Sequence, residues 1–500
     1  MIKDIKYKFQ NLIEFLKKDL ISKIREYDFI LKPLLCIFII CSIAIIPLIR
    51  ADFNYNDDLG RVALGYKDWE YFSRFGSTFL STFVHASNYL TDVSPLTQLL
   101  AIFIMSLTGI IILYVYKEKK SFSLWDIVAI IPLILSPYFL ECLSYKYDSP
   151  YMSLSVFASV FPLLFRKKHY IIYSIVIVLC TLLMCITYQA SSGIFLMFAL
   201  LLCFKDWNRG ESLKKNLKFL LISVGNFLLG LLLFRIFIMR PVETYVSNSI
   251  FLIKELPLGI LKNLYKYFSL VYTDFKEKWL VLIAFMVISV IIIFIKDSKR
   301  KKYLALPVSI LTILFMGILS FGIYPFLTSP LFDPRAMYGF GVFISLIGVA
   351  IVNSNKVYLS RIIVLILSWV FIVFSCTYGN ALKVQDEYTD FRVNLVISDL
   401  KDLEIFSDNT TKKVQISGTI GKSPILKNMP QNYQILNRLV PIQFAESWDW
   451  AEFYFFNYFD LRNVNRYILN DLTEYNLPIL KDTMYHTIRG NEEFILIELK

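Results

Sequence analysis

The amino-acid sequence predicts an α-helical polytopic membrane protein that carries a small α/β domain at its C-terminal end. First, 56% of the 500 residues are hydrophobic and only 18% are charged, which is too few charges for the surface of a soluble protein of this length. Second, apolar runs of about 20 residues recur along the first three quarters of the chain, each able to cross a hydrocarbon core about 30 Å thick as a helix. Third, charges become frequent and apolar runs shorten after Cys376.

We predict eleven membrane spans from these runs, in a transmembrane domain that covers residues 31–376. Their approximate limits are 31–49, 94–116, 124–140, 151–165, 170–187, 189–204, 218–239, 279–295, 303–325, 337–353 and 357–376. In the preceding residues 1–30, apolar side chains recur every three to four positions between lysines. This spacing predicts an amphipathic cytoplasmic helix that lies on the inner leaflet.

The positions of lysine and arginine predict the orientation of the spans, because cationic loops stay in the cytoplasm. Eight of these residues lie in the first 32 positions, and further clusters follow every second span, at 117–120, 166–168, 205–218 and 296–302. The N-terminus is therefore expected inside, and the outer segments are 50–93, 141–150, 240–278, 326–336 and everything after residue 376. The net charge of +12 is explained by this topology and requires no nucleic-acid partner.

Residues 377–500 are expected to form a soluble α/β domain outside the membrane. Their patterns predict a helix over 380–405, strands over 413–420 and 439–444, an aromatic-rich helix over 449–461, and a hairpin of 486–488 with 494–499. A segment of about 120 residues is long enough to bury a core of its own.

Cysteine and histidine are too dispersed to predict a metal site or a disulfide framework. All seven cysteines fall in or beside the spans, and the three histidines, His85, His169 and His486, are scattered over both sides of the membrane. We therefore expect no cofactor and no bound metal.

The most informative motif follows the first span, where Asn56 precedes the acidic pair Asp57 and Asp58, and Arg61 comes one turn later. One interpretation is structural, with Asn56 capping a short helix and Asp57 pairing with Arg61. The other is catalytic, because two carboxylates and an arginine at a bilayer surface lie where a lipid-linked substrate would meet a base. We favour the second interpretation.

Further candidates for substrate binding lie in the outer loops. Trp69 and Arg74 continue the first loop in an amphipathic stretch that predicts a binding shelf on the membrane surface. Lys146 and Asp148, flanked by tyrosines between the third and fourth spans, could contact sugar hydroxyls or a phosphate, or simply belong to a helix start. Gln189 follows the fifth span, where hydrogen bonding between helices is the alternative to substrate binding.

Two arginines are placed where a cation is disfavoured. Arg335 lies in the first turn of the tenth span, at the positive end of the helix dipole and on the outer side, which suggests that an anion compensates it. Arg235 lies within an apolar span and is a functional candidate for that reason. The alternative is that its side chain extends to the membrane surface.

Together, Asn56-Asp57-Asp58-x-x-Arg61, Asp92-x-Ser94-Pro95-Leu96, Tyr147-x-Ser149, Tyr188-Gln189-Ala190 and Pro334-Arg335 resemble the serotype-converting O-antigen glucosyltransferases of bacteria and their prophages, the Gtr type II-like group. The resemblance covers roughly residues 40–390 and rests on the order and spacing of these motifs. It implies a C-type (GT-C) membrane glycosyltransferase in the bacterial inner membrane, with its active site facing the periplasm. The implied donor is undecaprenyl-phosphate-glucose, and the implied acceptor is a lipid-linked O-antigen repeat of lipopolysaccharide.

The resemblance also implies roles for particular residues and partners. The first acidic residue of the pair is the usual base in such enzymes, which assigns that role to Asp57 with Asp58 in support, although an Asp-Glu pair is usual and the division of labour stays open. Arg61, Arg235 and Arg335 could bind the departing phosphate, which would make a divalent metal dispensable. A small flippase and a cytoplasmic polyprenyl-phosphate glucosyltransferase would act upstream.

Two other classes of membrane protein fit the sequence less well. An O-antigen polymerase is expected to rely on arginine-rich outer loops, and no loop here has that character. A lipid flippase or transporter needs charged residues deep in many spans, whereas Arg235 is nearly alone.

Overall fold

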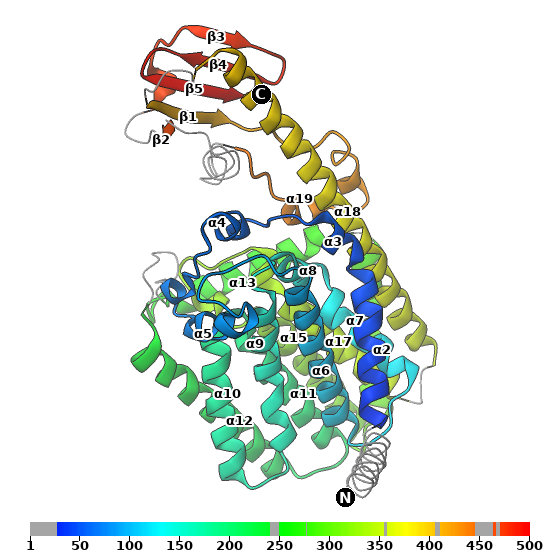
Figure 1. Ribbon diagram of the computed structural model, residues 1–500. Coiled ribbons are helices and arrows are strands. Elements are labelled where there is room, and N and C mark those ends of the chain that lie inside the picture. The colour runs from blue at the N-terminus through cyan, green and yellow to red at the C-terminus, as the bar shows by residue number, and fades with distance from the viewer. Residues whose placement is uncertain are drawn as a thin grey trace, which may run out of the picture.

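The structure is a body of packed helices with a small β-sheet held beyond one end of it (Figure 1). It is a computed structural model that describes residues 28–240, 250–276, 278–354, 358–405, 411–445, 464–466 and 471–500. The expected amphipathic helix over 1–30 and the aromatic-rich helix over 449–461 lie almost entirely outside these residues.

The chain enters the body through α2 (Asp28–Ala44) and α3 (Ile46–Ala51), and then forms a compact outer loop. The loop contains α4 (Asp57–Leu64), the 3-10 helix η1 (Trp69–Phe72) and α5 (Phe75–Val84). The first half of the body continues with α6 (Leu96–Lys117), α7 (Leu124–Leu135), α8 (Pro137–Ser144), α9 (Ser149–Val160), η2 (Phe161–Phe165), α10 (Tyr170–Thr187), η3 (Gln189–Gly193) and α11 (Ile194–Asn208).

The second half of the body runs from residue 213 to the long helix α18. It contains α12 (Leu213–Leu233), the π-helix η4 (Phe234–Ile238), α13 (Leu256–Asp274), α14 (Lys278–Lys296), α15 (Lys302–Leu319), η5 (Tyr324–Phe326), α16 (Pro334–Met337), α17 (Gly339–Val352) and α18 (Leu359–Asp402).

Within the described ranges, eight helices are long and apolar enough to cross a membrane, or nine if α7 and α8, which meet at a bend of 58°, form one broken span. The chain is thus a multi-pass membrane protein, while the expected number of eleven is not confirmed. The remaining two expected spans, 31–49 and 151–165, correspond to α2–α3 and to α9 with η2. Pro162 stands at the start of η2, where a missing N–H favours the change from α-helix to 3-10 helix.

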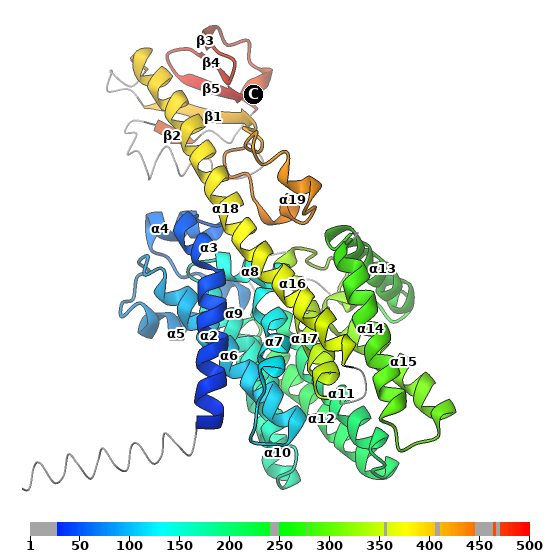
Figure 2. The ribbon, with the colours of Figure 1, turned by 90° about the vertical axis from the view of Figure 1, so that its right-hand side faces the viewer.

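Helix α18 is one continuous helix of 44 residues, which corrects the expectation of a span over 357–376 and a separate helix over 380–405. It leaves the body and runs to the sheet (Figure 2). Gly379 lies at its closest approach to α3, where an added Cβ would come within 2.2 Å of the backbone nitrogen of Leu48. This glycine therefore serves packing between two helices and does not end α18.

The sheet has five strands in the order β2-β1-β5-β4-β3. They are β1 (Lys412–Gly418), β2 (Val464–Arg466), β3 (Ile479–Asp482), β4 (His486–Gly490) and β5 (Phe494–Leu499). The expected hairpin is confirmed, because β4 and β5 pair antiparallel, and so is the first expected strand, since β1 pairs parallel with both β2 and β5.

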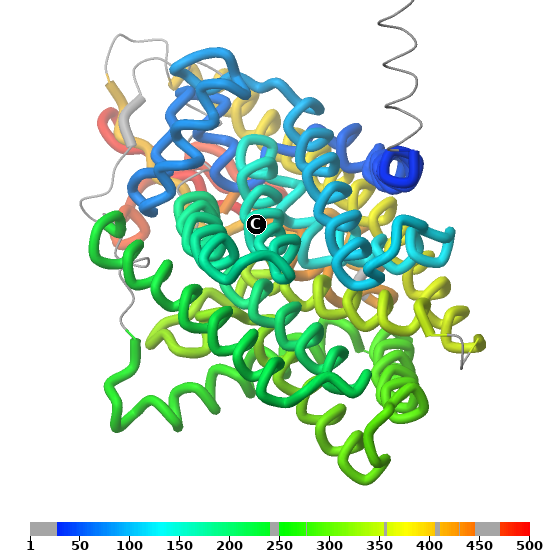
Figure 3. Tube along the Cα trace, turned by 90° about the horizontal axis from the view of Figure 1, so that it is seen from below, coloured from blue at the N-terminus to red at the C-terminus, as the bar shows by residue number. Residues whose placement is uncertain are grey.

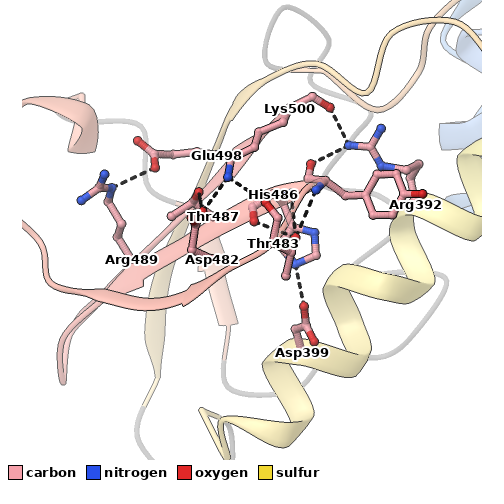
Figure 4. A network of polar contacts seen from close by, with 10 residues as sticks. Arg392, Asp399, Asp482, Thr483, His486, Thr487, Arg489, Glu498 and Lys500 are labelled. Atoms are coloured by element: carbon pink, nitrogen blue, oxygen red, sulfur yellow. Dashed lines mark hydrogen bonds and ion pairs between the residues drawn. The ribbon is translucent and has the colours of Figure 1, made fainter.

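The far end of α18 is joined to this sheet by the polar contacts in Figure 4 and by a shared apolar cluster. The guanidinium of Arg392 donates to the backbone carbonyls of Tyr485 at 2.6 Å and Lys500 at 2.7 Å. Nε2 of His486 lies 2.9 Å from a carboxylate oxygen of Asp399. Burial lowers the pKa of His486, although Asp399 opposes the shift.

The segment between β1 and β2 returns to the helical body. The expected strand over 439–444 is wrong, because the chain there ends the short helix α19 (Leu436–Leu439) and continues without a strand. The carbonyl of Leu439 accepts hydrogen bonds from the hydroxyls of Tyr55 at 2.9 Å and Tyr378 at 3.3 Å. Leu436, Leu439 and Val440 belong to the apolar core of the body. These contacts hold the start of the segment on the body, and its end is linked to the chain after β1 by an isolated antiparallel bridge between Thr419 and Ala445 and by a hydrogen bond of 3.2 Å from the N–H of Ile420 to the carbonyl of Phe444.

Candidate functional site

Asp57 and Asp58 open α4, but their side chains have very different surroundings. Asp58 is completely buried, and one of its oxygens accepts the backbone N–H of Lys146 at 2.8 Å. Burial raises the pKa of Asp58 well above its usual range, Arg61 opposes this shift, and Asp148 adds to it. Asp58 is therefore a structural carboxyl that ties the start of α4 to the loop after α8.

Arg61 is also buried, with 3% of its side chain exposed, and it forms an ion pair with Asp148. Its guanidinium lies 4.6 Å from the ring centroid of Trp69, and the indole N–H of Trp69 donates to the other oxygen of Asp148. Burial by itself would lower the pKa of Arg61, but Asp148, Asp57 and Asp58 raise it, so the guanidinium stays charged.

Lys146 completes this arrangement from the same loop. Its Nζ donates to Asp52 at 2.5 Å, to Asn54 at 3.0 Å and to Asp92 at 3.0 Å, and only 4% of its side chain is exposed. We call Asp58, Arg61, Trp69, Lys146 and Asp148 the paired network, because each side chain or backbone group in it is bound to another part of the loops.

Asp57 lies outside the paired network. It is half-buried, and no hydrogen bond or ion pair joins its carboxylate to any residue that the structure describes. It is one of the charges that act on the hydroxyl of Tyr145: burial raises the pKa of Tyr145, Arg335 opposes this, and Glu141 and Asp57 add to it. Asp57 thus lies in the electrostatic environment that Tyr145 shares with Arg335.

Arg335 reaches this place from the start of α16. One of its terminal nitrogens donates to the hydroxyl of Tyr145, and the guanidinium lies 5.0 Å from the centroid of that ring. The other terminal nitrogen is 3.6 Å from Asp333, and 20% of the side chain is exposed. Its buried Nε has no hydrogen-bond partner.

A second arginine approaches from the first outer loop. Nε of Arg74 donates to the side-chain oxygen of Gln189 at 3.3 Å, and its guanidinium lies 4.5 Å from the ring centroid of Tyr188. The hydroxyl of Tyr188 donates to the backbone carbonyl of Arg335 at 3.4 Å. We call Asp57, Arg74, Gln189 and Arg335, together with Tyr145 and Tyr188, the open cluster.

Asn56 does not cap α4 as expected. Its backbone has φ of 49°, its side chain makes no capping bond, and its amide instead donates to the hydroxyl of Tyr145 at 3.1 Å. The expected pair between Asp57 and Arg61 is likewise replaced by the pair between Arg61 and Asp148.

Arg235 stands apart from both groups. It is exposed in η4, and its side chain makes no ion pair or hydrogen bond with the described part of the chain. The structure thus brings together nine of the ten candidate residues in two adjoining groups and leaves this one outside them.

Glu141 is a residue that the sequence reasoning missed. It is 3% exposed in α8, accepts the backbone N–H of Arg335, and lies 3.5 Å from the hydroxyl of Tyr55. The signal was available, because Glu141 is the sole carboxylate in the otherwise apolar and hydroxyl-bearing segment Pro137–Ser144. It positions the first turn of α16, and with it Arg335.

No group of three or more His, Cys, Asp or Glu side chains that could hold a metal ion occurs in the ranges that the structure describes. The charged groups of the open cluster are one carboxylate and two guanidiniums. Chemically, this set can accept a proton and bind an oxyanion.

Comparison with known proteins agrees with the resemblance in the motifs. A family model described as glucosyl transferase GtrII matches residues 46–346, more than half of the chain. The chain is also 26% identical over 421 residues to an uncharacterized 55.3 kDa protein in the gtrB 5′ region of Salmonella phage P22, and the match covers 81% of this chain and 86% of the relative. No solved structure matches the chain.

Proposed function

Because the chain belongs to the glucosyl transferase GtrII family, we propose that it moves a glucosyl residue from undecaprenyl-phosphate-glucose to a lipid-linked O-antigen acceptor. Family membership gives the class, a membrane glucosyltransferase that acts in O-antigen modification. The donor, the stereochemistry and the membrane face are part of the proposal.

One observation carries the assignment of the catalytic group: Asp57 is a half-buried carboxylate without a partner among the described residues, beside a cluster that contains two arginines. We assign it as the general base. It takes the proton of the acceptor hydroxyl while the acceptor oxygen forms a bond to the anomeric carbon of glucose. The bond between that carbon and the phosphate oxygen breaks in the same step, so the configuration inverts.

The leaving group is a lipid phosphate, which departs as an anion and needs no general acid. Arg335 and Arg74 would stabilise the charge that develops on it, because guanidiniums bind two phosphate oxygens at once. The greater exposure of the Arg335 side chain, 20% against 3% for Arg61, supports this role. Gln189 and Tyr145 would hold the two guanidiniums in place.

The other candidate residues receive a supporting role in this proposal. Arg61, Asp148, Trp69, Asp58 and Lys146 are occupied by one another and by loop carboxylates, so they fix α4 and present Asp57. Arg235 takes no part in binding the donor, since it is exposed and separate from the open cluster.

We further propose that α4, the open cluster and the C-terminal domain face the periplasm, with the N-terminus in the cytoplasm of the inner membrane. Alkaline phosphatase fused after Lys500 should then be active in cells, and the same reporter fused after Lys119, in the loop between α6 and α7, should be inactive. An inactive fusion after Lys500 would contradict this orientation.

The activity is tested with the purified protein in liposomes, given undecaprenyl-phosphate-glucose and a lipid-linked O-antigen repeat. We expect one glucose to be added per acceptor site, with the anomeric configuration opposite to that of the donor, and no transfer from UDP-glucose. Elongation of the O-antigen without added glucose would indicate a polymerase. Movement of the donor across the bilayer without transfer would indicate a flippase.

A further inference from the structure

A cavity of about 650 Å³ lies at the end of the helical body opposite α4, the end that faces the viewer in Figure 3. It is formed where α6, α11, α14 and α17 end and where α7 and α18 begin. Asn208 holds part of its wall in place, because its amide donates to the carbonyl of Phe294 at 2.8 Å and so joins the ends of α11 and α14.

The charged groups that line this cavity are mostly cations. The basic residues are Lys117, Lys119, Lys205, Arg209 and Arg361, and the one carboxylate in the lining is that of Asp297. The cavity therefore has a strongly positive lining at the level where the helices of the body end.

Lys205 is the most unusual of these cations, because only 6% of it is exposed. Its Nζ donates to the backbone carbonyl of Tyr116 and lies 4.4 Å from the centroid of the Tyr116 ring. No carboxylate pairs with it among the residues that the structure describes. A buried ammonium is costly unless an anion compensates it, so the neutral carbonyl and ring leave this site incomplete.

Carboxylates are present at this end of the body, but they form ion pairs with other cations. Arg166 is bound to Asp206 at 2.7 Å and also to Glu118, and Lys117 is bound to Asp126 at 2.6 Å. Lys119, Lys205 and Arg209 form no such pair within the described ranges. Attraction of cations to helix C-termini explains exposed lysines at this end, but it does not explain a buried, unpaired one that lines a cavity.

We propose that this cavity binds a phosphate group, carried either by the head group of an anionic lipid or by free phosphate. Basic pockets between the ends of membrane helices are suited to phosphate head groups, because the lipid surface lies at the same level. Arg209, which is exposed at the rim, would meet the ligand first, and Lys205 would bind it from within. The site is separate from the open cluster and requires nothing of the reaction proposed there.

The test measures lipid binding to the full-length protein in detergent, by titration with short-chain phosphatidylglycerol and, separately, phosphatidylcholine. We expect the protein to prefer phosphatidylglycerol. Arg209→Gln should weaken that binding about fivefold, and Lys205→Gln with Arg209→Gln about 30-fold, since each cation at such a surface contributes comparably. The control is Lys168→Gln, which removes an exposed cation at the same end of the body but outside the cavity lining.

Inorganic phosphate distinguishes the two sources of the ligand. Competition between phosphate and phosphatidylglycerol supports a lipid head group held through its phosphate. If inorganic phosphate binds but phosphatidylglycerol does not, and if Arg209→Gln weakens the binding of phosphate, the result supports a site for a soluble phosphate ligand. The proposal is overturned if phosphatidylglycerol and phosphatidylcholine bind alike and phosphate does not bind, or if Lys168→Gln weakens binding as much as Arg209→Gln does. If the double variant fails to fold, the Arg209→Gln protein tests the proposal alone, because substitution of an exposed side chain should not prevent folding.

Discussion

The paired network and the open cluster are adjacent, are both rich in charge, and share the first turn of α4, yet they differ in how their charges are satisfied. In the paired network, Arg61 is matched by Asp148, and Lys146 by Asp52 and Asp92. In the open cluster, Asp57 has no partner within the described chain, and 20% of the Arg335 side chain is exposed, against 3% for Arg61. Successive residues of a helix point about 100° apart, so the same turn directs Asp58 into the core and Asp57 out of it. Ion pairing and exposure therefore distinguish the residues that we assign to building the site from those that we assign to binding the substrate.

The largest effect is expected from Asp57→Asn. The amide keeps the shape of the carboxylate but cannot take the acceptor proton, so the rate of sugar transfer should fall by about 10² to 10⁴-fold. Because Asp57 has no partner among the described residues, the melting temperature should not change. Initial rates with purified donor, alongside thermal melting, check both statements, and a D57N protein with the wild-type rate would remove Asp57 as the base.

Arg335 should come next. Arg335→Ala removes a cation from the departing phosphate, and the rate should fall by about 10² to 10³-fold. Arg335→Lys keeps the charge but loses the planar fork, so it should mainly raise the KM for the donor. Measuring kcat and KM for both variants tests this assignment. Unchanged donor kinetics in the alanine variant would return Arg335 to a structural role beside Asp333.

Arg61→Met tests the structural role of the paired network. It leaves the buried carboxylate of Asp148 without its cation, which should cost about 3 to 5 kcal/mol of folding stability. Adding Asp148→Asn should restore part of that loss, because the remaining group is no longer charged. Denaturation of the single and double variants measures the effect. A single variant that melts like the wild type but binds donor poorly would move Arg61 into the open cluster.

The smallest effect is expected from Asp58→Asn, whose amide can still accept the N–H of Lys146. Burial raises the pKa of Asp58, so the folded state holds this proton more strongly than the unfolded state does. The resulting stabilisation is present below the unfolded pKa of about 4 and is lost as pH rises through the folded pKa. As the pH rises above about 4, the stability of the D58N protein should therefore fall less than that of the wild type. The rate of sugar transfer should change by less than about tenfold. Melting temperatures across pH test this, and identical pH profiles for the two proteins would contradict it.

The sequence predicted well those features that depend on one segment at a time. Apolar runs of sufficient length located most spans, and the Gly490-Asn491 pair between two short segments located the β4–β5 hairpin. The sequence predicted less well those features that depend on contacts between distant segments of the chain. Residues 439–444 look like a strand, but Leu439 is held by Tyr55 and Tyr378 on the helical body.

The candidate site illustrates the same limit. The sequence identified the acidic pair from its place after the first span, and Arg335 from its place in the first turn of a helix, where a cation is disfavoured. It could not distinguish Asp57 from Asp58, since that depends on which side of α4 meets the loop after α8. Nor could it pair Arg74 with Gln189, which are 115 residues apart in the chain.

The length of helix α18 sets the distance between the body and the sheet. Its 44 residues span about 66 Å at 1.5 Å per residue, and Arg392 fastens its far end to the strands. Deleting one residue between Gly379 and Arg392 would lower the sheet by about 1.5 Å and also turn it by about 100°. Deleting seven residues would move the sheet by about 10 Å and turn it by only about 20°. The distance of the sheet from the body can therefore change with its orientation nearly preserved only by particular numbers of residues, such as about seven or about eleven.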